Sequence, residues 1–464
     1  MLVNICIVGG GFSGTATAIH LLREASFGVS LTIIERAGEL GRGVAYGVES
    51  DRFLLNVPAG RMGLYVDDEE HFFHFLRVQS ADFAPGDFVP RKTYGGYVAA
   101  EFYRTLNNGT HRFSSVEDSA ISIHRQADET LSVALQSGER LKGFTHVVLA
   151  CGNALPSVPP IFKDLQHHRH FFANPWSDLG RNSLNGLHNV LLVGTSLTMV
   201  DVSLNILEHD RTKKVVAVSR RGLLPQAHRP HGQPPSYGHV PPMLVGSDPT
   251  ALSYLKAIRK HSLLLKRNGV DWREMMASLR PLTPRLWETL PTRERARFLR
   301  HLRPYWDTHR HRIASAVSDR LHSLMANGDI EVISGRFVSA ESPGDSFRVQ
   351  IAHRSGRIDY RDFHAIVNCT GPESDLRKTA DPLVASLLDT GAAQQDHLKL
   401  GLRVGPSGEL IGGDGREDRR LYVVGPLLKG DHWEATAVPE LRAHARKTAR
   451  AILQHAQTLA TSSN

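Results

Sequence analysis

Three glycines near the N-terminus have the spacing of a dinucleotide-binding turn. Gly9, Gly11 and Gly14 follow an apolar run and precede small and apolar residues at helical period, in the segment NICIVGGGFSGTATAIHLL. In such a turn the first glycine permits a tight bend, the second lets the backbone approach a pyrophosphate, and the third lets the helix pack closely on the strand. The N-terminus of that helix attracts the phosphates. The spacing therefore predicts a dinucleotide site at the start of the chain.

An acidic residue stands where the ribose of this dinucleotide is expected. Glu35 ends the next expected strand, in LTIIER, and Arg36 follows it. A carboxylate at this distance from the glycines hydrogen-bonds ribose hydroxyls. The alternative interpretation is an ordinary glycine turn with a surface glutamate.

A glycine-rich stretch favours FAD over NAD at this first site. Residues 38–64, GELGRGVAYGVESDRFLLNVPAGRMGL, are irregular and contain Arg42, Asn56 and Arg61 as polar anchors. An extended loop of this type suits a long dinucleotide whose flavin ring stays exposed at one end. A surface loop that binds nothing is the alternative.

A second, reduced copy of the motif occurs at residues 190–201, VLLVGTSLTMVD. Gly194 is its single glycine, and Ser196 and Met199 occupy the later glycine positions. From Gly9 to Glu35 is 26 positions, and 26 positions from Gly194 lead to Arg220, with Arg221 next. Arginine in place of the acid accommodates a 2′-phosphate, so the copy predicts a looser site for NADPH rather than NADH. A solvated arginine turn, or a domain that has lost its ligand, are the alternatives.

Several segments together resemble the FAD/NAD(P)-binding oxidoreductases related to flavin-containing monooxygenases. They are the N-terminal glycine motif, GRGVAYG, LLNVPAG, FVPRKTYGGY, HVVLACGNALPSVPP, LRPYWDTHRHR and GDHWEATAVPELR, and they extend over nearly the whole chain. The resemblance implies one domain for FAD and one for NAD(P). Within this group the chain is similar to flavin-dependent urate hydroxylases.

The expected fold is α/β, with two Rossmann-like dinucleotide-binding domains and a helical insertion. Residues 1–160 form the first part of the FAD domain, 161–224 the NAD(P) domain, 225–330 a loop and helical insertion, and 331–464 the return to both domains. The strand-like stretches FRVQIAH and AIVNCTGPESDL are expected to return the chain to the flavin domain. The last helix, beginning near Thr436, is expected to direct its N-terminus at the flavin.

The C-terminal flavin-facing segment departs from the pattern of the resembling proteins in one position. In those proteins a strand ends in Gly-Asp, and the acid lies near the flavin ribityl chain. Here Gly425 is followed by Pro426, and neither Asp431 nor Glu434 can be assigned as its substitute.

A basic and aromatic stretch is a candidate substrate site. In the stretch RARFLRHLRPYWDTHRHRI, arginines and histidines are interleaved near aromatic residues, among them Arg300, Arg303, Arg310, Arg312, His301, His309 and His311. Planar guanidinium groups and aromatic rings suit an anionic heterocycle. The alternative is a charged helix face with Trp306 in the core.

Whole-chain properties limit the function further. A chain of 464 residues exceeds one ordinary core. Its net charge is +8, and the basic residues are spread along the chain with acidic residues between them, which favours anionic small molecules over nucleic acid as partners. Cys6, Cys151 and Cys369 are far apart and lack CxxC spacing, so they are expected to be reduced core thiols, and no metal set is evident. Because no signal peptide or membrane span is evident, the chain is expected to be soluble and cytoplasmic, with no membrane partner.

These features predict an FAD-dependent, NAD(P)H-consuming monooxygenase that hydroxylates a small, anionic heterocyclic substrate with molecular oxygen. The candidate reaction is urate to 5-hydroxyisourate, a step of purine catabolism. A reductase or oxidase without oxygen transfer, and a non-catalytic FAD/NAD(P) sensor, are the alternatives. A histidine from 228–239 or from 301–311 could deprotonate the substrate, but the sequence does not single one out, nor does it give the oligomeric state.

Overall fold

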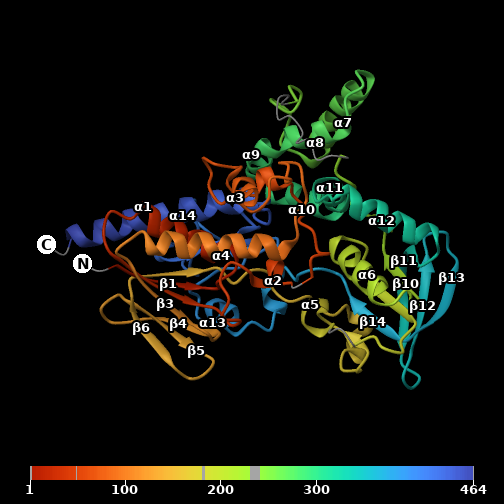
Figure 1. Ribbon diagram of the computed structural model, residues 1–464, viewed down its shortest axis with the longest axis horizontal. Coiled ribbons are helices and arrows are strands. Elements are labelled where there is room, and N and C mark those ends of the chain that lie inside the picture. The colour runs from red at the N-terminus through yellow and green to blue at the C-terminus, as the bar shows by residue number, and fades with distance from the viewer. Residues whose placement is uncertain (1–2, 49, 180–182, 230–240, 463–464) are drawn as a thin grey trace. The chain divides into compact units, whose positions relative to one another are not determined.

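The computed structural model describes residues 3–48, 50–179, 183–229 and 241–462. They form two compact units, each built on its own largely parallel sheet (Figure 1). The first unit comprises Met1–Ala154, Pro234–Ala296 and Ser374–Asn464, and the second comprises Leu155–Gln233 and Arg297–Glu373. The predicted α/β class with two parallel sheets is therefore confirmed.

The first unit contains a six-stranded sheet in the order β15-β16-β7-β1-β2-β3. Its strands are β15 (Glu409–Ile411), β16 (Glu417–Val423), β7 (His146–Leu149), β1 (Val3–Val8), β2 (Val29–Ile34) and β3 (Arg112–Val116). All neighbours pair in parallel except β15 and β16. Strands β1, β2 and β7 are almost wholly buried, as expected for a parallel sheet that is covered on both faces.

Two hydrophobic cores cover the two faces of this sheet. On one face lie α1 (Phe12–Glu24), α4 (Arg91–Asn107) and α14 (Val438–Ser462), seen together above the sheet in Figure 1. On the other lie a three-stranded antiparallel sheet and α13 (Pro382–Asp389). That small sheet consists of β4 (Ala120–Arg125), β5 (Leu131–Leu135) and β6 (Arg140–Phe144). Shorter helices in the connections are α2 (Gly43–Tyr46) and α3 (His71–Gln79).

The second unit contains a seven-stranded sheet in the order β13-β12-β11-β10-β9-β14-β8. The strands are β8 (Phe171–Phe172), β9 (Asn189–Val193), β10 (Lys214–Ser219), β11 (Ile330–Glu341), β12 (Phe347–His353), β13 (Ile358–Phe363) and β14 (Ala365–Asn368). Strands β8 to β11 and β14 pair in parallel, and β12 and β13 continue the sheet as an antiparallel hairpin. The helices of this unit are α5 (Pro175–Asp178), α6 (Leu197–His209), α11 (Arg303–Arg310) and α12 (Ser315–Ala326).

The structure corrects one expectation about the last third of the chain. Strands β12 and β14, the stretches FRVQIAH and AIVN, belong to the second unit and not to the flavin domain. Strand β14 lies between β9 and β8, so the second sheet is incomplete without it. The chain returns to the first unit at Ser374. A short apolar strand carries no sequence signal of the sheet it joins, which is why the pattern alone misplaced it.

The predicted insertion 225–330 is shared between the two units. Helices α7 (Ala251–Arg267), α8 (Trp272–Leu279) and α9 (Thr283–Thr289) belong to the first unit, and α10 (Thr292–His301) contains the boundary. Helix α9 is fixed to the first unit by Trp287, whose Nε1 donates to the Gly430 carbonyl at 2.9 Å and whose ring stacks on Trp433. Arg280, just after α8, forms a bidentate pair with Glu440 in the first turn of α14.

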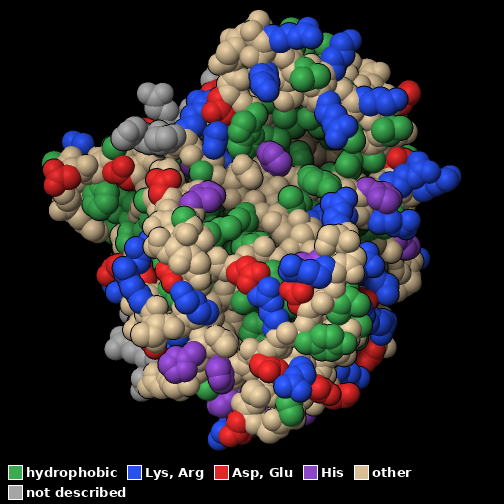
Figure 2. Space-filling model, turned by 90° about the vertical axis from the view of Figure 1, so that its right-hand side faces the viewer, with side chains coloured by type: hydrophobic (Ala, Val, Ile, Leu, Met, Phe, Trp, Pro, Cys, Tyr) green, Lys and Arg blue, Asp and Glu red, His purple; other side chains and the backbone are tan. Residues whose placement is uncertain are grey.

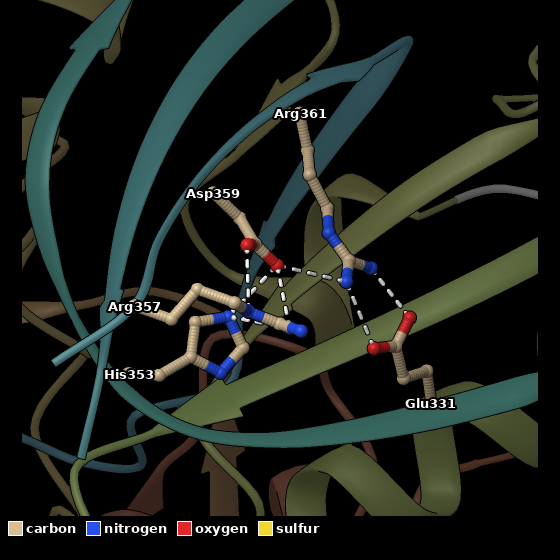
Figure 3. A network of polar contacts seen from close by, with 5 residues as sticks. All are labelled: Glu331, His353, Arg357, Asp359 and Arg361. Atoms are coloured by element: carbon tan, nitrogen blue, oxygen red, sulfur yellow. Dashed lines mark hydrogen bonds and ion pairs between the residues drawn. The ribbon is translucent and has the colours of Figure 1, made fainter. Parts of the chain in front are cut away.

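A polar network occupies the hairpin edge of the second sheet (Figure 3). Arg361 on β13 pairs with Glu331 on β11, and its guanidinium also donates to Asp359 at 3.3 Å. Asp359 in turn lies 2.8 Å from His353 Nε2 and 2.9 Å from Arg357 Nε. Charged side chains at an edge strand oppose pairing with another chain, so this network is explained by the fold and is not a candidate site.

Charged side chains of both signs are mixed on the face drawn in Figure 2, where Lys and Arg lie among Asp and Glu. In the part of the chain that the structure describes, no helix combines the length and apolar character that crossing a membrane requires.

Candidate dinucleotide sites

The first glycine turn lies between β1 and α1 and leaves no space for side chains. Gly9 has φ +105°, and a Cβ there would lie 2.3 Å from the Ala150 carbonyl oxygen at the end of β7. A Cβ on Gly14 would lie 1.9 Å from the Gly9 carbonyl oxygen. The first and third glycines are therefore required by close backbone packing, as the motif predicts.

The N-terminus of α1 is open toward the glycine turn. Gly11 is its N-cap residue, no side chain caps it, and the first turn contains no acidic residue. A Cβ on Gly11 would have only Gly43 nearby, with its Cα at 3.6 Å. The second glycine thus keeps a space between the turn and the loop 38–43, where backbone N–H groups and the helix dipole favour an anion.

Glu35 lies directly beside the turn. The carboxylate is buried, its Oε2 accepts from Gly10 N at 2.7 Å, and its Oε1 accepts from Ala37 N at 3.2 Å. These bonds hold the carboxylate at the end of β2. Arg36, the next residue, is exposed.

The loop after Glu35 is fastened to the glycine turn by a residue that the sequence analysis missed. Thr15 Oγ1 donates to the Gly10 carbonyl at 2.8 Å and accepts from Gly41 N at 3.1 Å, while Gly41 N also donates to Gly10 O at 2.8 Å. A hydroxyl directly after the third glycine is the only signal in the sequence, and Ser13 and Thr17, also buried on α1, weaken it. The loop is therefore a fixed wall of the site.

The three predicted anchors of this loop differ in position. Arg42 immediately precedes Gly43, and its Nε lies 3.3 Å from Glu39. Asn56 is half-buried in the segment whose Leu55 N donates to Val89 O, and Arg61 ends a short 3₁₀ turn, Ala59–Arg61. Burial is the main cause that lowers the pKa of Arg61, and the neighbouring Arg280 adds to it. The structure thus places Arg42 beside the glycine turn.

Gly425, at the end of β16, also borders α1. It has φ +94°, and a Cβ there would lie 3.0 Å from Ser13 Oγ in the first turn of α1. Asp431 Oδ2 accepts from Val404 N at 3.1 Å, and Glu434 is buried. Asp431 is therefore used in holding the backbone, and α14 begins at Val438, close to the expected start near Thr436.

These residues fit the pyrophosphate of a dinucleotide such as FAD. The fit rests on a turn that only glycines can form, an uncapped helix N-terminus without acidic residues, and a carboxylate fixed beside the turn. The nearby thiol of Cys151 is neutral, because burial raises its pKa to about 12. Burial also raises the pKa of Cys6 and Cys369 above the usual range, and all three cysteines are free.

The second turn, between β9 and α6, repeats the geometry of the first with fewer glycines. Gly194 has φ +118°, and a Cβ there would lie 2.6 Å from the Cys369 carbonyl oxygen. Ser196 is the N-cap residue of α6, but its side chain makes no capping bond, and the first turn again contains no acid. Met199 is fully buried, where the first turn has Gly14. The positive-φ glycine and the open helix N-terminus are therefore retained.

The structure corrects the predicted equivalence of Arg220 and Glu35. In the first unit Val8 pairs with Ile34, and Gly9 N donates to Ile34 O. In the second unit Val193 pairs with Val218, and Gly194 N donates to Val218 O. The second copy is one residue shorter between the glycine and this position, so Ser219, 25 positions after Gly194, takes the place of Glu35, 26 positions after Gly9.

Ser219, like Glu35, forms a hydrogen bond to a residue of its glycine turn. Its hydroxyl lies 2.8 Å from Thr195 Oγ1 and accepts from Gly222 N at 3.0 Å. Arg220 and Arg221 follow it as Arg36 follows Glu35. Arg220 is exposed, whereas the Arg221 guanidinium lies 5.8 Å above the Tyr305 ring of α11. The ribose end of this site therefore has a hydroxyl and two cations, and no acid.

The basic stretch 297–312 is not one continuous face. It is divided at Leu302 between α10 and α11, and Arg303 and His311 both lie within 4 Å of Asp307. Trp306 is half-buried rather than in the core. Of the histidines considered as bases, His231 and His239 lie outside the described residues, and His228 N donates to the Ile313 carbonyl. The structure does not single out a catalytic base.

Comparison with known proteins agrees with this geometry. A family model described as FAD-NAD(P)-binding matches residues 6–154. Salicylate hydroxylase from Pseudomonas putida is 31% identical over 111 residues, which are 22% of this chain and 26% of the length of that relative. The match thus spans about a quarter of the hydroxylase.

Two solved structures resemble nearly the whole chain. An ornithine N-hydroxylase from Kutzneria sp. 744, with reduced FAD, NADP+ and L-ornithine, has a TM-score of 0.63 at 14% identity and covers 98% of this chain and 100% of that one. A cadaverine monooxygenase from Erwinia amylovora, bound to FAD, has a TM-score of 0.63 at 13% identity and covers 97% and 94%. The chain thus has the fold of these flavoprotein monooxygenases, and the match to the FAD-NAD(P)-binding family model covers the N-terminal part of the first unit.

Proposed function

We propose that this protein is a flavin-dependent monooxygenase that oxidises NADPH and hydroxylates a small molecule. The observation that carries the proposal is the presence of two separate turns of dinucleotide-binding geometry in one chain, one in each unit. Two such sites suit hydride transfer from a nicotinamide to a flavin. The first turn, with three glycines, is assigned to FAD, and the second, with one, to a nicotinamide that binds and leaves.

The residues of the first unit bind and orient. The N–H groups at the start of α1 would hold the pyrophosphate, Glu35 would accept from the ribose hydroxyls, and Arg42, next to Gly43, would add a positive charge near the turn. Bound FAD supplies the redox chemistry and the activation of oxygen. As in the resembling family, the start of α14 would direct its N–H groups toward a bound flavin and stabilise negative charge there.

The electron acceptor is inferred from the cysteines. A reductase that passes electrons to a disulfide needs a pair of thiols, and the thiolate is the reactive form. Here the three cysteines are far apart in sequence, free and neutral. Oxygen, with a bound organic substrate, is therefore the proposed acceptor. A reductase or oxidase without oxygen transfer, or a sensor, is the competing proposal.

NADPH is proposed over NADH because of the ribose end of the second site. Ser219 offers a hydroxyl where an acid would repel a 2′-phosphate, and the adjacent Arg220 supplies a guanidinium. Anaerobic mixing with NADPH or NADH, followed by flavin absorbance, tests this step. Faster bleaching by NADPH at equal concentration supports the proposal, and equal or faster bleaching by NADH contradicts it.

The substrate has two candidate classes. The similarity in sequence motifs favours urate, an anionic heterocycle. The two similar structures are instead an ornithine N-hydroxylase and a cadaverine monooxygenase, whose named substrates are amines. Aerobic NADPH consumption with urate, salicylate, ornithine, lysine and cadaverine distinguishes the classes. Stimulation by urate alone supports purine catabolism, stimulation by an amine excludes it as the main role, and stimulation by none of them contradicts both candidates.

A further inference from the structure

Helix α7 presents a basic face with apolar residues along its centre. The helix contains five Lys or Arg residues and no Asp or Glu. Leu252 and Leu263 are 59% and 61% exposed, and Leu264 is 46% exposed. These leucines are unusual, because large aliphatic side chains on a helix of a folded protein normally face its core.

The spacing of these residues places leucines and cations on one stripe. Positions 252, 256, 259, 260, 263 and 267 recur at intervals of three or four residues and therefore share one side of the helix. Leu252 and Leu263 lie along the middle of this stripe. The cations flank it, with Arg259 and Lys266 on one side and Lys256, Lys260 and Arg267 on the other, and all five are exposed. We call these seven residues the α7 face.

The opposite side of α7 is fixed to the first unit. Ala251 N donates to the buried Glu294 carboxylate at 3.1 Å, and the Tyr254 hydroxyl lies 3.0 Å from Thr289 Oγ1. Ala257 and His261 are buried on this side. The α7 face is therefore the outward face of a helix whose packing is already satisfied.

The turn before α7 adds to the same surface. Val245 is 72% exposed. A shallow pocket of about 400 Å³ lies between this turn and the helix and is lined by Ser247, Ser253, Lys256 and Lys260, together with Asp248. Two ammonium groups and two hydroxyls suit a phosphate-bearing group. Helix α7 lies at the top of Figure 1.

We propose that the α7 face binds the surface of an anionic phospholipid bilayer. Leu252 and Leu263 enter the boundary between headgroups and acyl chains, and the flanking Lys and Arg side chains extend to the phosphates. This placement departs from the expectation of no membrane partner, which rested on the lack of an evident signal peptide and of a membrane-spanning segment. It goes beyond the proposed oxidoreductase function and does not depend on it.

The composition of the face favours a bilayer over an acidic protein. Protein interfaces are enriched in aromatic residues and depleted in lysine. The α7 face has three lysines and no aromatic residue, and Tyr254 lies on the packed side. A narrow aliphatic line between two rows of cations matches a layered surface, apolar inside and anionic outside.

Sedimentation with vesicles tests the proposal on the full chain with FAD bound. The protein should sediment with vesicles of phosphatidylcholine and phosphatidylglycerol, much less with phosphatidylcholine alone, and less as salt is raised. Lys256→Gln with Lys260→Gln should lower the partition coefficient about 10- to 30-fold, since each cation near an anionic membrane contributes on the order of 1 kcal/mol. Leu252→Gln with Leu263→Gln, which keeps charge and helix propensity, should lower it at least about tenfold.

A matched control removes two equal charges elsewhere in the first unit. Arg140→Gln with Lys142→Gln, at exposed positions of β6, should leave vesicle binding unchanged apart from a small salt-like decrease. Absence of sedimentation, equal sedimentation with both vesicles, or an equal loss in the control would overturn the proposal. So would a dimer, seen by light scattering, that the leucine variant converts to monomer without any vesicle binding.

Discussion

At the scale of single residues, the first site depends on positions where one methyl group cannot be placed. The motif places glycines at 9 and 14, and the structure shows no room for a side chain at either: Gly9 has a positive φ and meets Ala150 O, and Gly14 meets Gly9 O. Thr15 was missed because its role depends on the hydrogen bond from Gly41 N, which joins two segments 26 positions apart. The sequence could therefore predict the turn but not what holds the loop against it.

Gly9→Ala should abolish most FAD binding. The new Cβ would lie 2.3 Å from Ala150 O at a φ that L-residues rarely adopt, so the turn must move. The ratio of flavin to protein absorbance after purification measures the loss, and FAD titration should show at least a tenfold weaker Kd, about 1.4 kcal/mol. Gly96→Ala in α4, where no atom lies within 4 Å, is the control and should retain FAD. Normal flavin content in Gly9→Ala would refute the assigned site.

Arg220→Gln should raise the KM for NADPH and leave the KM for NADH nearly unchanged. A charge-assisted hydrogen bond to a 2′-phosphate contributes about 1.5 to 3 kcal/mol, so the ratio of the two KM values should change about 10- to 100-fold. Arg211→Gln, another exposed arginine of the second unit, serves as control. Equal changes for both nicotinamides would exclude a role at the 2′-position.

At the scale of elements, the strands and helices of both turns follow from hydrophobic period and glycine spacing. The pairing of these strands with their neighbours does not follow from these patterns. The second copy is one residue shorter than the first, so Ser219 takes the place of Glu35, although the spacing of the first copy predicted Arg220. Register is fixed by packing across the sheet, and β14 likewise is placed by its neighbours β8 and β9. Both errors concern contacts between distant segments.

Buried histidines between elements should make the fold sensitive to acid. His146 on β7 is fully buried, its Nε2 lies 3.0 Å from His455 Nδ1 on α14, and burial, with His455 adding to it, lowers its pKa to about 3. Burial also lowers the pKa of His20 and of His444 to about 4. Below about pH 6.5, and down to the lowered pKa of each histidine, the unfolded chain binds more protons than the folded chain. The free energy of unfolding therefore falls as the pH falls through this range.

His146→Gln tests this linkage. Between pH 6 and 4 the wild-type free energy of unfolding should fall by up to about 1.4 kcal/mol per pH unit for each such histidine, and the variant should lose one such contribution. Urea unfolding at several pH values measures the slope. His124→Gln, at an exposed position of β4, should keep the wild-type slope, and an unchanged slope in His146→Gln would contradict the assignment.

At the scale of the whole molecule, two dinucleotide folds in one chain define the proposed chemistry more than any single catalytic side chain does. The sequence predicted the two units because each begins with its own strand, glycine turn and helix. It could not assign residues 234–296 to the first unit, since that placement depends on contacts such as the stacking of Trp287 on Trp433. The substrate is not fixed by either fold.

Tracing the oxygen atom in the product is the most direct test of whether this protein is a monooxygenase. The FAD-loaded protein is incubated with NADPH, ¹⁸O-labelled dioxygen and the substrate that stimulates NADPH consumption. The mass of the product is then measured by mass spectrometry. A monooxygenase should give one labelled atom per product molecule, in proportion to the NADPH consumed. NADPH oxidation with all label recovered in peroxide or water, and none in an organic product, would contradict a monooxygenase and leave an oxidase or reductase.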